Sequence, residues 1–362
     1  MKIYKVFVII SFLNIFSSCY IAKAVKYRKY HLSDIPKFDV EHFQKSKTPF
    51  RFHQGFLPME DKLQLDSTFQ GSNIYSFLII RNDSILYEFY NQGITDSTIL
   101  PSFSVAKSFT STLVQMAHQE GRIKSLDEPI TNYIPELKNR DSRFEKITIQ
   151  HVLDMRSGIK STENYGNPFS DVLKLGFAKN IRAKMLKIKI ESVPNLTFEY
   201  KSANTQLLAM IVESATKERF KDYFYRKIYQ PLDMEYDASW HIDDVKHREI
   251  RAFCCLNMAA RDFAKFGKLY LDKGKFHQTQ LLDSNWVSIL SHSDTMEKYD
   301  GYKNQWWKGS GNGNFQAVGI LGQSIAIFPS KHMIIVKLQN TQLPSHPLKK
   351  GWHSTVNKIV GL

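Results

Sequence analysis

Residues 74–91 read IYSFLIIRNDSILYEFYN, two apolar runs separated by a short polar stretch. Runs rich in Ile, Tyr and Phe are typical of strands, and Asn82 and Asp83 are turn formers, so the stretch predicts a β-hairpin. Strand patterns return at residues 315–340, where FQAVGI, SIAIF and MIIVKLQN follow one another. The block between, from about residue 125 to 235, has a mainly helical pattern. Early and late strands around a helical block predict an α+β fold, in which an antiparallel sheet is flanked by helices and the block is an inserted lobe.

The composition is that of an ordinary globular chain. Of its 362 residues, 43% are apolar and 23% are charged, which excludes disorder, collagen and coiled coil as overall classes. Only three cysteines occur, and because Cys254 and Cys255 are adjacent we expect small buried hydrophobes rather than a redox pair or a structural disulfide. The net charge of +14 comes with no nucleic-acid-binding motif, so we expect no nucleic-acid partner.

The N-terminus has the pattern of an export signal. A basic start at residues 1–5 precedes the uncharged run VFVIISFLNIFSSCYIA, and Ser17-Ser18-Cys19 resembles a bacterial lipobox with Phe16 at the usual leucine position. We expect a signal peptide over residues 1–18, a lipid on Cys19, a tether over residues 19–50 and the main folded domain over residues 51–362. The protein would then be a membrane-anchored lipoprotein of the cell envelope, with a periplasmic form or a signal anchor as alternatives.

The strongest chemical signal is Ser104-Val105-Ala106-Lys107, at the start of a helix predicted over residues 103–120. Residues three apart lie on one helix face, so the Lys107 amine can reach the Ser104 hydroxyl. The N–H groups at the start of a helix also suit a developing anion. By itself the motif is weak, and an N-cap serine followed by an exposed lysine explains it more simply.

Two later features could complete a site. Tyr200 precedes an apolar helix, and a tyrosine near a lysine amine can have its pKa lowered and act as a general base. The alternative for Tyr200 is a buried aromatic with a bonded hydroxyl. Gly319-Ile320-Leu321-Gly322-Gln323 begins a late strand, where glycines let a substrate carbonyl reach a backbone N–H. A bulge or tight turn explains the same glycines.

These three elements, in this order and spacing, resemble the serine β-lactamase and penicillin-binding-protein superfamily. The likeness is greatest to class C β-lactamase-related serine hydrolases, in particular the 6-aminohexanoate-dimer-hydrolase-like branch. It extends over about residues 70–340 and includes LDEPI at 126–130, ITIQHVLDMRSG at 147–158 and ARDFAKFG at 260–267. The resemblance implies a β-lactamase/transpeptidase-like fold and an exported hydrolase that cleaves small esters, amides or peptides without a cofactor. The histidine spacing also gives no metal-site motif.

The resemblance assigns roles to individual residues. Ser104 would be the nucleophile, Lys107 and Tyr200 its acid–base partners, and the backbone N–H groups of Ser104 and Gln323 the oxyanion hole. Expected substrate-binding residues are Ser202, Asn204, Trp306, Ile320, Leu321 and Gly322.

Two positions depart from the family pattern. Ser202 replaces the usual asparagine of Tyr-x-Asn, and Ile320 stands where lysine or histidine is usual. Without that cation a substrate carboxylate loses its partner, which disfavours anionic β-lactams as substrates. The altered motif also supports an alternative function, a non-catalytic module that senses a ligand or cell-wall fragment.

Overall fold

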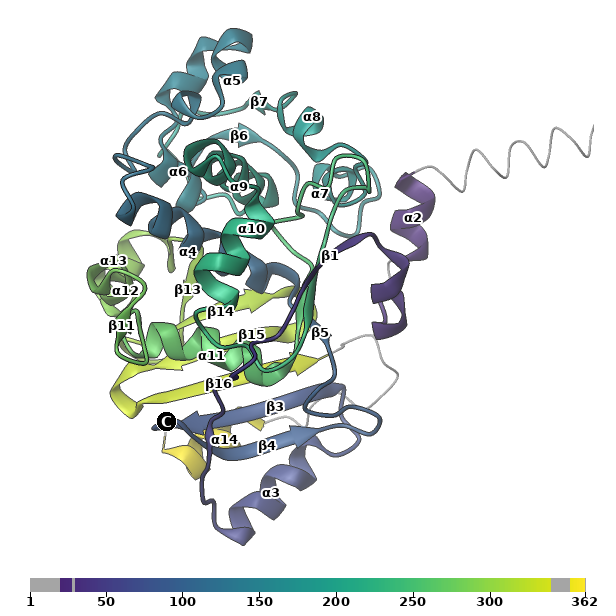
Figure 1. Ribbon diagram of the computed structural model, residues 1–362, viewed down its shortest axis with the longest axis vertical. Helices are drawn as coiled ribbons and strands as arrows, with labels where there is room; N and C mark the ends of the chain where they lie inside the picture. The colour runs from purple at the N-terminus through teal and green to yellow at the C-terminus, as the bar shows by residue number, and fades with distance from the viewer. Residues whose placement is uncertain (1–19, 28–29, 340–351, 362) are drawn as a thin grey trace, which may run out of the picture.

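The computed structural model describes residues 20–27, 30–339 and 352–361 and contains one large sheet below a helical lobe (Figure 1). The sheet has eight strands in the order β12-β13-β14-β15-β16-β3-β4-β2, antiparallel except for β2 beside β4. Their bounds are β2 (His53–Gln54), β3 (Ile74–Arg81), β4 (Ser84–Tyr90), β12 (Tyr302–Lys303), β13 (Trp306–Lys308), β14 (Phe315–Gly319), β15 (Gln323–Phe328) and β16 (Met333–Gln339).

The predicted hairpin is β3 and β4. Asn82 and Asp83 have positive φ values of 48° and 57°, which the tight turn of a two-residue hairpin requires. β3 also pairs with β16, so that Arg81 lies opposite Met333. The early and late strands therefore share one sheet, which confirms the predicted α+β architecture; the last predicted strand residue, Asn340, lies outside the described residues.

Helices cover both faces of the sheet. Because side chains alternate along a strand, Phe77 and Ile79 pack on one face with α3 (Met59–Phe69) and α14 (Trp352–Val360). Leu78 and Ile80 belong to the main core, which α4 (Ala106–Gln119) and α11 (Ala260–Leu271) also build. A Cβ at Gly267 of α11 would lie 2.8 Å from the Ile334 side chain, so glycine allows this helix to pack closely on the sheet.

The lobe is mostly helical, with one short strand pair that the sequence did not predict. Its longest helix is α9 (Ser202–Thr216), which packs on α4 and α6. The other elements are η3 (Ile130–Asn132), α5 (Pro135–Arg140), η4 (Ser142–Lys146), α6 (Ile149–Leu153), β6 (Ile159–Lys160), α7 (Asp171–Gly176), α8 (Ile181–Met185), β7 (Lys189–Ile190), α10 (Phe220–Phe224) and η5 (Tyr225–Tyr229).

Short elements complete the fold near the sheet. They are η2 (Phe103–Val105), β10 (Lys275–Phe276), β11 (Thr279–Gln280), α12 (Ser284–Ser288), η6 (Ile289–Ser291), α13 (Ser293–Lys298), η7 (Ile320–Gly322) and η8 (Pro329–Lys331).

The N-terminal segment differs from the expected tether. After α2 (Tyr20–Lys26) and η1 (Leu32–Lys37), β1 (Val40–Phe43) joins a second sheet with β8 (Ala238–His241), β9 (Leu256–Met258) and β5 (Leu100–Pro101). Phe43 is buried in the main core, and the buried Glu41 carboxylate accepts hydrogen bonds of 2.8 Å from Arg219 and Arg248. Residues 30–50 are therefore part of the folded domain; Cys19 and the predicted signal peptide lie outside the described residues.

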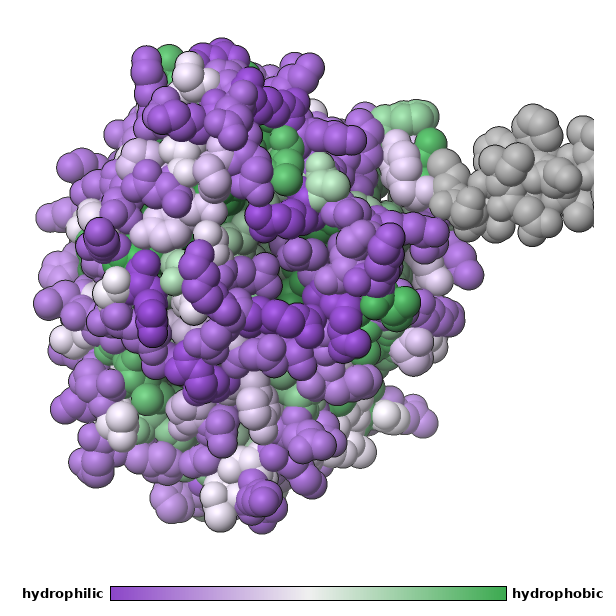
Figure 2. All heavy atoms as spheres, turned by 45° about the horizontal axis from the view of Figure 1, so that its top comes forward, coloured by the Kyte–Doolittle hydropathy of each residue, from purple (hydrophilic) through white to green (hydrophobic). Residues whose placement is uncertain are grey.

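No helix within residues 20–27, 30–339 or 352–361 is long and apolar enough to cross a bilayer. The face drawn in Figure 2 is largely hydrophilic, with small apolar patches between the polar side chains. This face is thus an ordinary solvated surface.

Candidate active site

Ser104 lies where a strand of the smaller sheet meets the first long helix. β5 leads into the single turn η2, which continues directly as α4. Phe103 in this turn has a φ of 44°, a left-handed conformation that is unfavourable for a residue with a side chain. Such strained positions concentrate at functional sites. The Ser104 side chain is nearly buried just before α4 and borders the aromatic-rich cavity described below.

Lys107 is enclosed and is bonded to the serine. Its Nζ lies 3.1 Å from Ser104 Oγ and 3.1 Å from Ser202 Oγ, and it donates to the Phe253 carbonyl at 2.8 Å. Burial lowers the pKa of Lys107 to about 8, although the Glu163 carboxylate acts in the opposite direction. A lysine with this pKa is partly neutral near physiological pH, so it can accept the Ser104 proton.

Tyr200, just before α9, is close to both Ser104 and Lys107. Its ring centroid is 5.0 Å from Lys107 Nζ, and its ring stacks on Trp307 at 5.6 Å. Burial raises the pKa of Tyr200 well above its usual value, while a hydrogen bond with Ser104 opposes that shift. The direction is opposite to the one expected from the sequence. In the resting site Tyr200 therefore keeps its proton, whereas Lys107 is the group that is partly neutral.

Glu163 is a site residue that sequence analysis missed. It lies in the loop between β6 and α7, and its carboxylate accepts hydrogen bonds from the Ser202 hydroxyl and, at 2.9 Å, from the Ser202 backbone N–H. Tyr165 Oη also donates to it at 2.9 Å. Ser202, the departure from the family pattern, thereby connects Lys107 to a carboxylate. No motif surrounds Glu163 in the sequence, so only its position in space identifies it.

We expect Glu163→Gln to move the pH dependence of activity downward. The Glu163 charge raises the pKa of Lys107, so its removal lowers that pKa and the neutral base appears at lower pH. The acidic limb of kcat/KM for a neutral ester should shift down by up to about one pH unit. Glu199→Gln, which alters an acid bonded to Lys201 instead, is the control. An unchanged limb in Glu163→Gln would contradict this coupling.

Gly319 brings the strand edge against the nucleophile. A Cβ at this position would lie 2.6 Å from the Ser102 carbonyl oxygen and 3.1 Å from the Ser104 nitrogen, so the close approach requires glycine. Gln323 pairs with Gly319 across β14 and β15, but its side chain is buried and bonds the Gln339 backbone. A role of the Gln323 N–H in the oxyanion hole stays a prediction.

A cavity of about 540 Å³ opens beside Ser104. Ile320 and Leu321 form part of its wall, in line with their predicted place at the substrate. The remaining wall is rich in aromatic residues and comes from the N-terminal segment, η2, α7 with its flanking loops and the loop before β9. Its aromatic members are Tyr27, Tyr30, Phe38, Phe103, Tyr165, Phe177 and Phe253. The site therefore combines a small polar cluster with a large apolar pocket.

Three predicted substrate-binding residues serve the fold instead. Asn204 is fully buried and is hydrogen-bonded to Ser157 Oγ and to the Met155 sulfur. At Gly322 an added Cβ would collide with the Gln339 side chain, so glycine allows this close packing. Trp306 is also fully buried, with its ring 4.3 Å from that of Tyr270. Its neighbour Trp307 stacks on Tyr200, so of the two tryptophans Trp307 is the one that contacts a residue of the candidate site.

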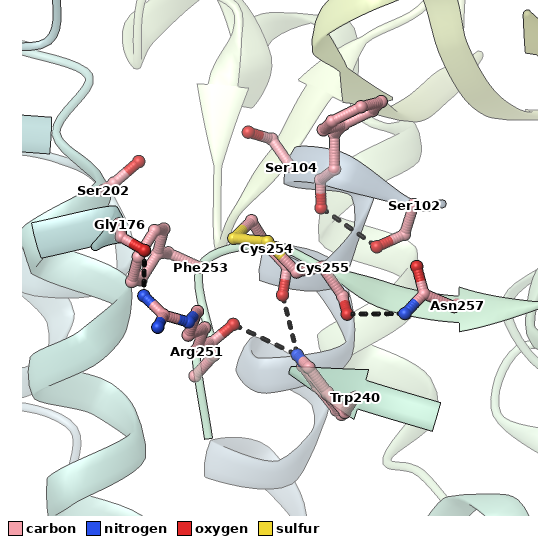
Figure 3. The surroundings of a disulfide bond; sticks show 12 residues. Ser102, Ser104, Gly176, Ser202, Trp240, Arg251, Phe253, Cys254, Cys255 and Asn257 are labelled. Atoms are coloured by element: carbon pink, nitrogen blue, oxygen red, sulfur yellow. Dashed lines mark hydrogen bonds between the residues drawn. A yellow bond between two sulfur atoms is a disulfide. The ribbon is translucent and has the colours of Figure 1, made fainter. Parts of the chain in front are cut away.

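The expectation for the adjacent cysteines is wrong. Cys254 and Cys255 form a disulfide with each other and are half-buried in the cavity wall, rather than being separate buried thiols (Figure 3). One group of potential metal ligands, Asp243, Asp244 and His247, also occurs among the described residues. Its carboxylates already accept backbone N–H groups, as at Ile181 and Glu249, which explains the cluster structurally.

Comparisons with known proteins agree with this geometry. The Beta-lactamase family model matches residues 71–356. The 6-aminohexanoate-dimer hydrolase of Paenarthrobacter ureafaciens is 29% identical over 307 residues, which are 79% of this chain and 76% of that protein.

Solved structures show the same fold. One from Bacillus anthracis, assigned as a 6-aminohexanoate-dimer hydrolase, has a TM-score of 0.75 at 24% identity and covers 92% of both chains. A class C β-lactamase has a TM-score of 0.58 at 16% identity, over 84% of this chain and 98% of its own. The chain therefore belongs to the Beta-lactamase family and is a serine hydrolase.

Proposed function

We propose that this serine hydrolase cleaves a neutral ester or amide of a small molecule through an acyl-enzyme on Ser104. The observation that carries the proposal is the contact of 3.1 Å between Ser104 Oγ and Lys107 Nζ, since the burial of Lys107 also lowers its pKa to about 8. A serine hydroxyl needs an adjacent base to become a nucleophile. Lys107 supplies that base at hydrogen-bond distance.

The reaction has two stages. Neutral Lys107 takes the Ser104 proton as Oγ attacks the substrate carbonyl, and the Ser104 N–H with that of Gln323 stabilises the oxyanion. Tyr200 then donates its proton to the leaving group as the bond breaks and regains a proton from Lys107. In the second stage a water attacks the acyl-enzyme, with the same groups moving its proton, and Ser104 is released.

The substrate is expected to be uncharged near the scissile bond. Ile320 borders the site where the family pattern has lysine or histidine, so a carboxylate there has no cationic partner from this position. Anionic β-lactams should therefore be poor substrates. The similarity to a 6-aminohexanoate-dimer hydrolase makes linear amides a reasonable class to test beside esters.

Fluorophosphonate labelling tests the proposal directly. An activated serine reacts with the probe, so the intact protein should gain one label on Ser104. A panel of p-nitrophenyl esters, nitrocefin, D-amino-acid amides and linear amide oligomers then identifies the bond class. Absence of both labelling and turnover would favour the non-catalytic sensing module instead.

We further propose that the chain is exported and carries a lipid on Cys19. The basic start and short apolar run ending at Ser-Ser-Cys support this, and a disulfide such as Cys254–Cys255 persists in oxidising compartments. Mass spectrometry of the mature protein should find residues 1–18 removed and a lipid mass on the new N-terminus. An intact N-terminus, or cleavage beyond Cys19, would exclude the lipid.

A further inference from the structure

We propose that the cavity beside Ser104 binds an apolar substituent of the substrate against the Cys254–Cys255 disulfide, so that esters or amides with a medium-length aliphatic or aromatic group are preferred. The inference rests on the proposed function for the reaction itself. It adds a substrate class and assigns a binding role to the cysteine pair.

The disulfide presents sulfur to the cavity. Both cysteines line it together with Ser104, and Figure 3 shows the sulfur atoms on the side toward the η2 turn. The carbonyl oxygens of the two cysteines lie on the opposite side. The Cys254 carbonyl accepts a hydrogen bond of 2.7 Å from Trp240 Nε1, and the Cys255 carbonyl accepts one of 3.3 Å from Asn257 Nδ2. Sulfur is polarisable and contacts apolar and aromatic groups favourably. The pair therefore forms an apolar surface within reach of the nucleophile.

The N-terminal segment supplies the facing wall. Tyr27 and Phe38 pack ring to ring at 4.8 Å, and each also contacts Phe177 of the loop after α7, at 6.4 Å and 6.5 Å. Tyr30 packs edge-on against Phe103, the residue before Ser104, at 5.5 Å. These rings extend the apolar surface from the disulfide up to the nucleophile.

Two basic side chains, Arg251 and His241, line the cavity beside the cysteines. The Arg251 guanidinium donates to the carbonyls of Ile242, Asp243 and Gly176. His241 stacks on Phe38 at 4.8 Å, and burial together with Arg251 lowers the pKa of His241 to about 3, so it is neutral. Because carbonyls accept from the Arg251 guanidinium and His241 is neutral, the sulfur and ring surfaces of this lining are left to contact an apolar substituent.

The volume sets the size of the substituent. A cavity of about 540 Å³ is in the range of ordinary small-molecule sites and exceeds what an acetyl group needs. Each methylene moved from water into such a pocket can raise kcat/KM up to about four-fold. We expect kcat/KM to rise at least about ten-fold from two carbons to six and to level off once the cavity is filled.

The test compares two series of neutral esters, p-nitrophenyl alkanoates from acetate to decanoate and aryl or alkyl acetates of increasing size. One series varies the acyl side and the other the leaving side, so they show which part occupies the cavity. Both are measured on oxidised wild type, on protein reduced with a phosphine, and on Cys254→Ala/Cys255→Ala. Alkylation and mass spectrometry verify the thiol state.

The readout is the ratio of kcat/KM for the longest good ester to that for acetate. General damage to the site, for example through the Phe253 carbonyl that holds Lys107, lowers both activities, whereas loss of the apolar wall lowers their ratio. The ratio should fall several-fold on reduction and in the double variant. Val245→Ala, which trims an exposed side chain outside the cavity, should keep the wild-type ratio.

Three results would overturn the inference. Equal turnover along both series in wild type would show that the cavity takes no apolar substituent. A chain-length preference that survives both reduction and the double variant would exclude the disulfide as its basis. If the double variant does not fold, Phe38→Ala tests the facing wall, and an unchanged ratio there contradicts the site. Each of these results can be distinguished from failure of the proposed function, because in that case the protein hydrolyses no ester and fluorophosphonate does not label Ser104.

Discussion

Ser104→Ala should abolish fluorophosphonate labelling and reduce ester turnover by about 10⁴-fold or more. The substitution removes the Oγ that accepts from Lys107 and bonds Tyr200, so no atom remains to form the acyl-enzyme. The side chain is small and nearly buried, and its loss leaves α4 intact. Intact-mass spectrometry after labelling and kcat/KM with p-nitrophenyl butyrate measure both effects.

Ser108→Ala is the matched control. Ser108 lies one turn further along the same helix, and its hydroxyl donates to the Gln305 carbonyl rather than to the site. This variant should lose at most about 1–2 kcal/mol of stability and keep its label. Wild-type turnover by Ser104→Ala, or a label on another serine, would refute the proposed nucleophile.

Lys107→Ala and Tyr200→Phe should each lower kcat/KM by about 10²–10⁴-fold, the usual loss when acid–base help is removed. They should differ in pH dependence. In wild type, kcat/KM should rise with pH as Lys107 loses its proton near its pKa of about 8. This rising limb of the pH profile should be absent in Lys107→Ala. Tyr200→Phe keeps the stacking on Trp307 and loses only the proton donor, so the limb should remain at reduced rate.

Tyr302→Phe controls for the aromatic cluster. Tyr302 packs 4.6 Å from Trp307 and 5.8 Å from Tyr200, but the described contacts give its hydroxyl no bond to Ser104. It should keep most of the activity. If Tyr302→Phe were as damaging as Tyr200→Phe, the Tyr200 hydroxyl would have no special role, and the assignment of the proton donor would fail.

Local pattern was enough to predict the sheet, whereas the core of the candidate site was selected by the order of three motifs and their resemblance to a known family. The turn chemistry of Asn82-Asp83 predicts the hairpin, and the spacing of Ser104 and Lys107 brings two functional groups onto one turn of backbone. Both depend on neighbours within a few residues. Contacts between distant segments have no such signal, which is why Glu163 was missed although it lies one hydrogen bond from Ser202.

Other errors arise from orientation. Trp306 and Trp307 are adjacent on β13, so one enters the core and the other faces Tyr200, and composition alone does not tell which.

The basic segment around residues 30–50 contains a strand of only four residues, too short for a periodic pattern to be evident. The left-handed φ of 69° at Cys255 likewise depends on its tertiary surroundings rather than on a local motif.

The pairing of β3 with β16 also bears on how the chain reaches its folded state. Arg81 and Met333, opposite one another at the centre of the sheet, are 252 positions apart. The sheet therefore cannot close until nearly the whole polypeptide has been synthesised, and such non-local pairing is slow even afterwards. A chain that remains unfolded for this long is available to a translocation machinery that threads extended polypeptide. The same delay exposes apolar strands, so refolding at high concentration should compete with aggregation.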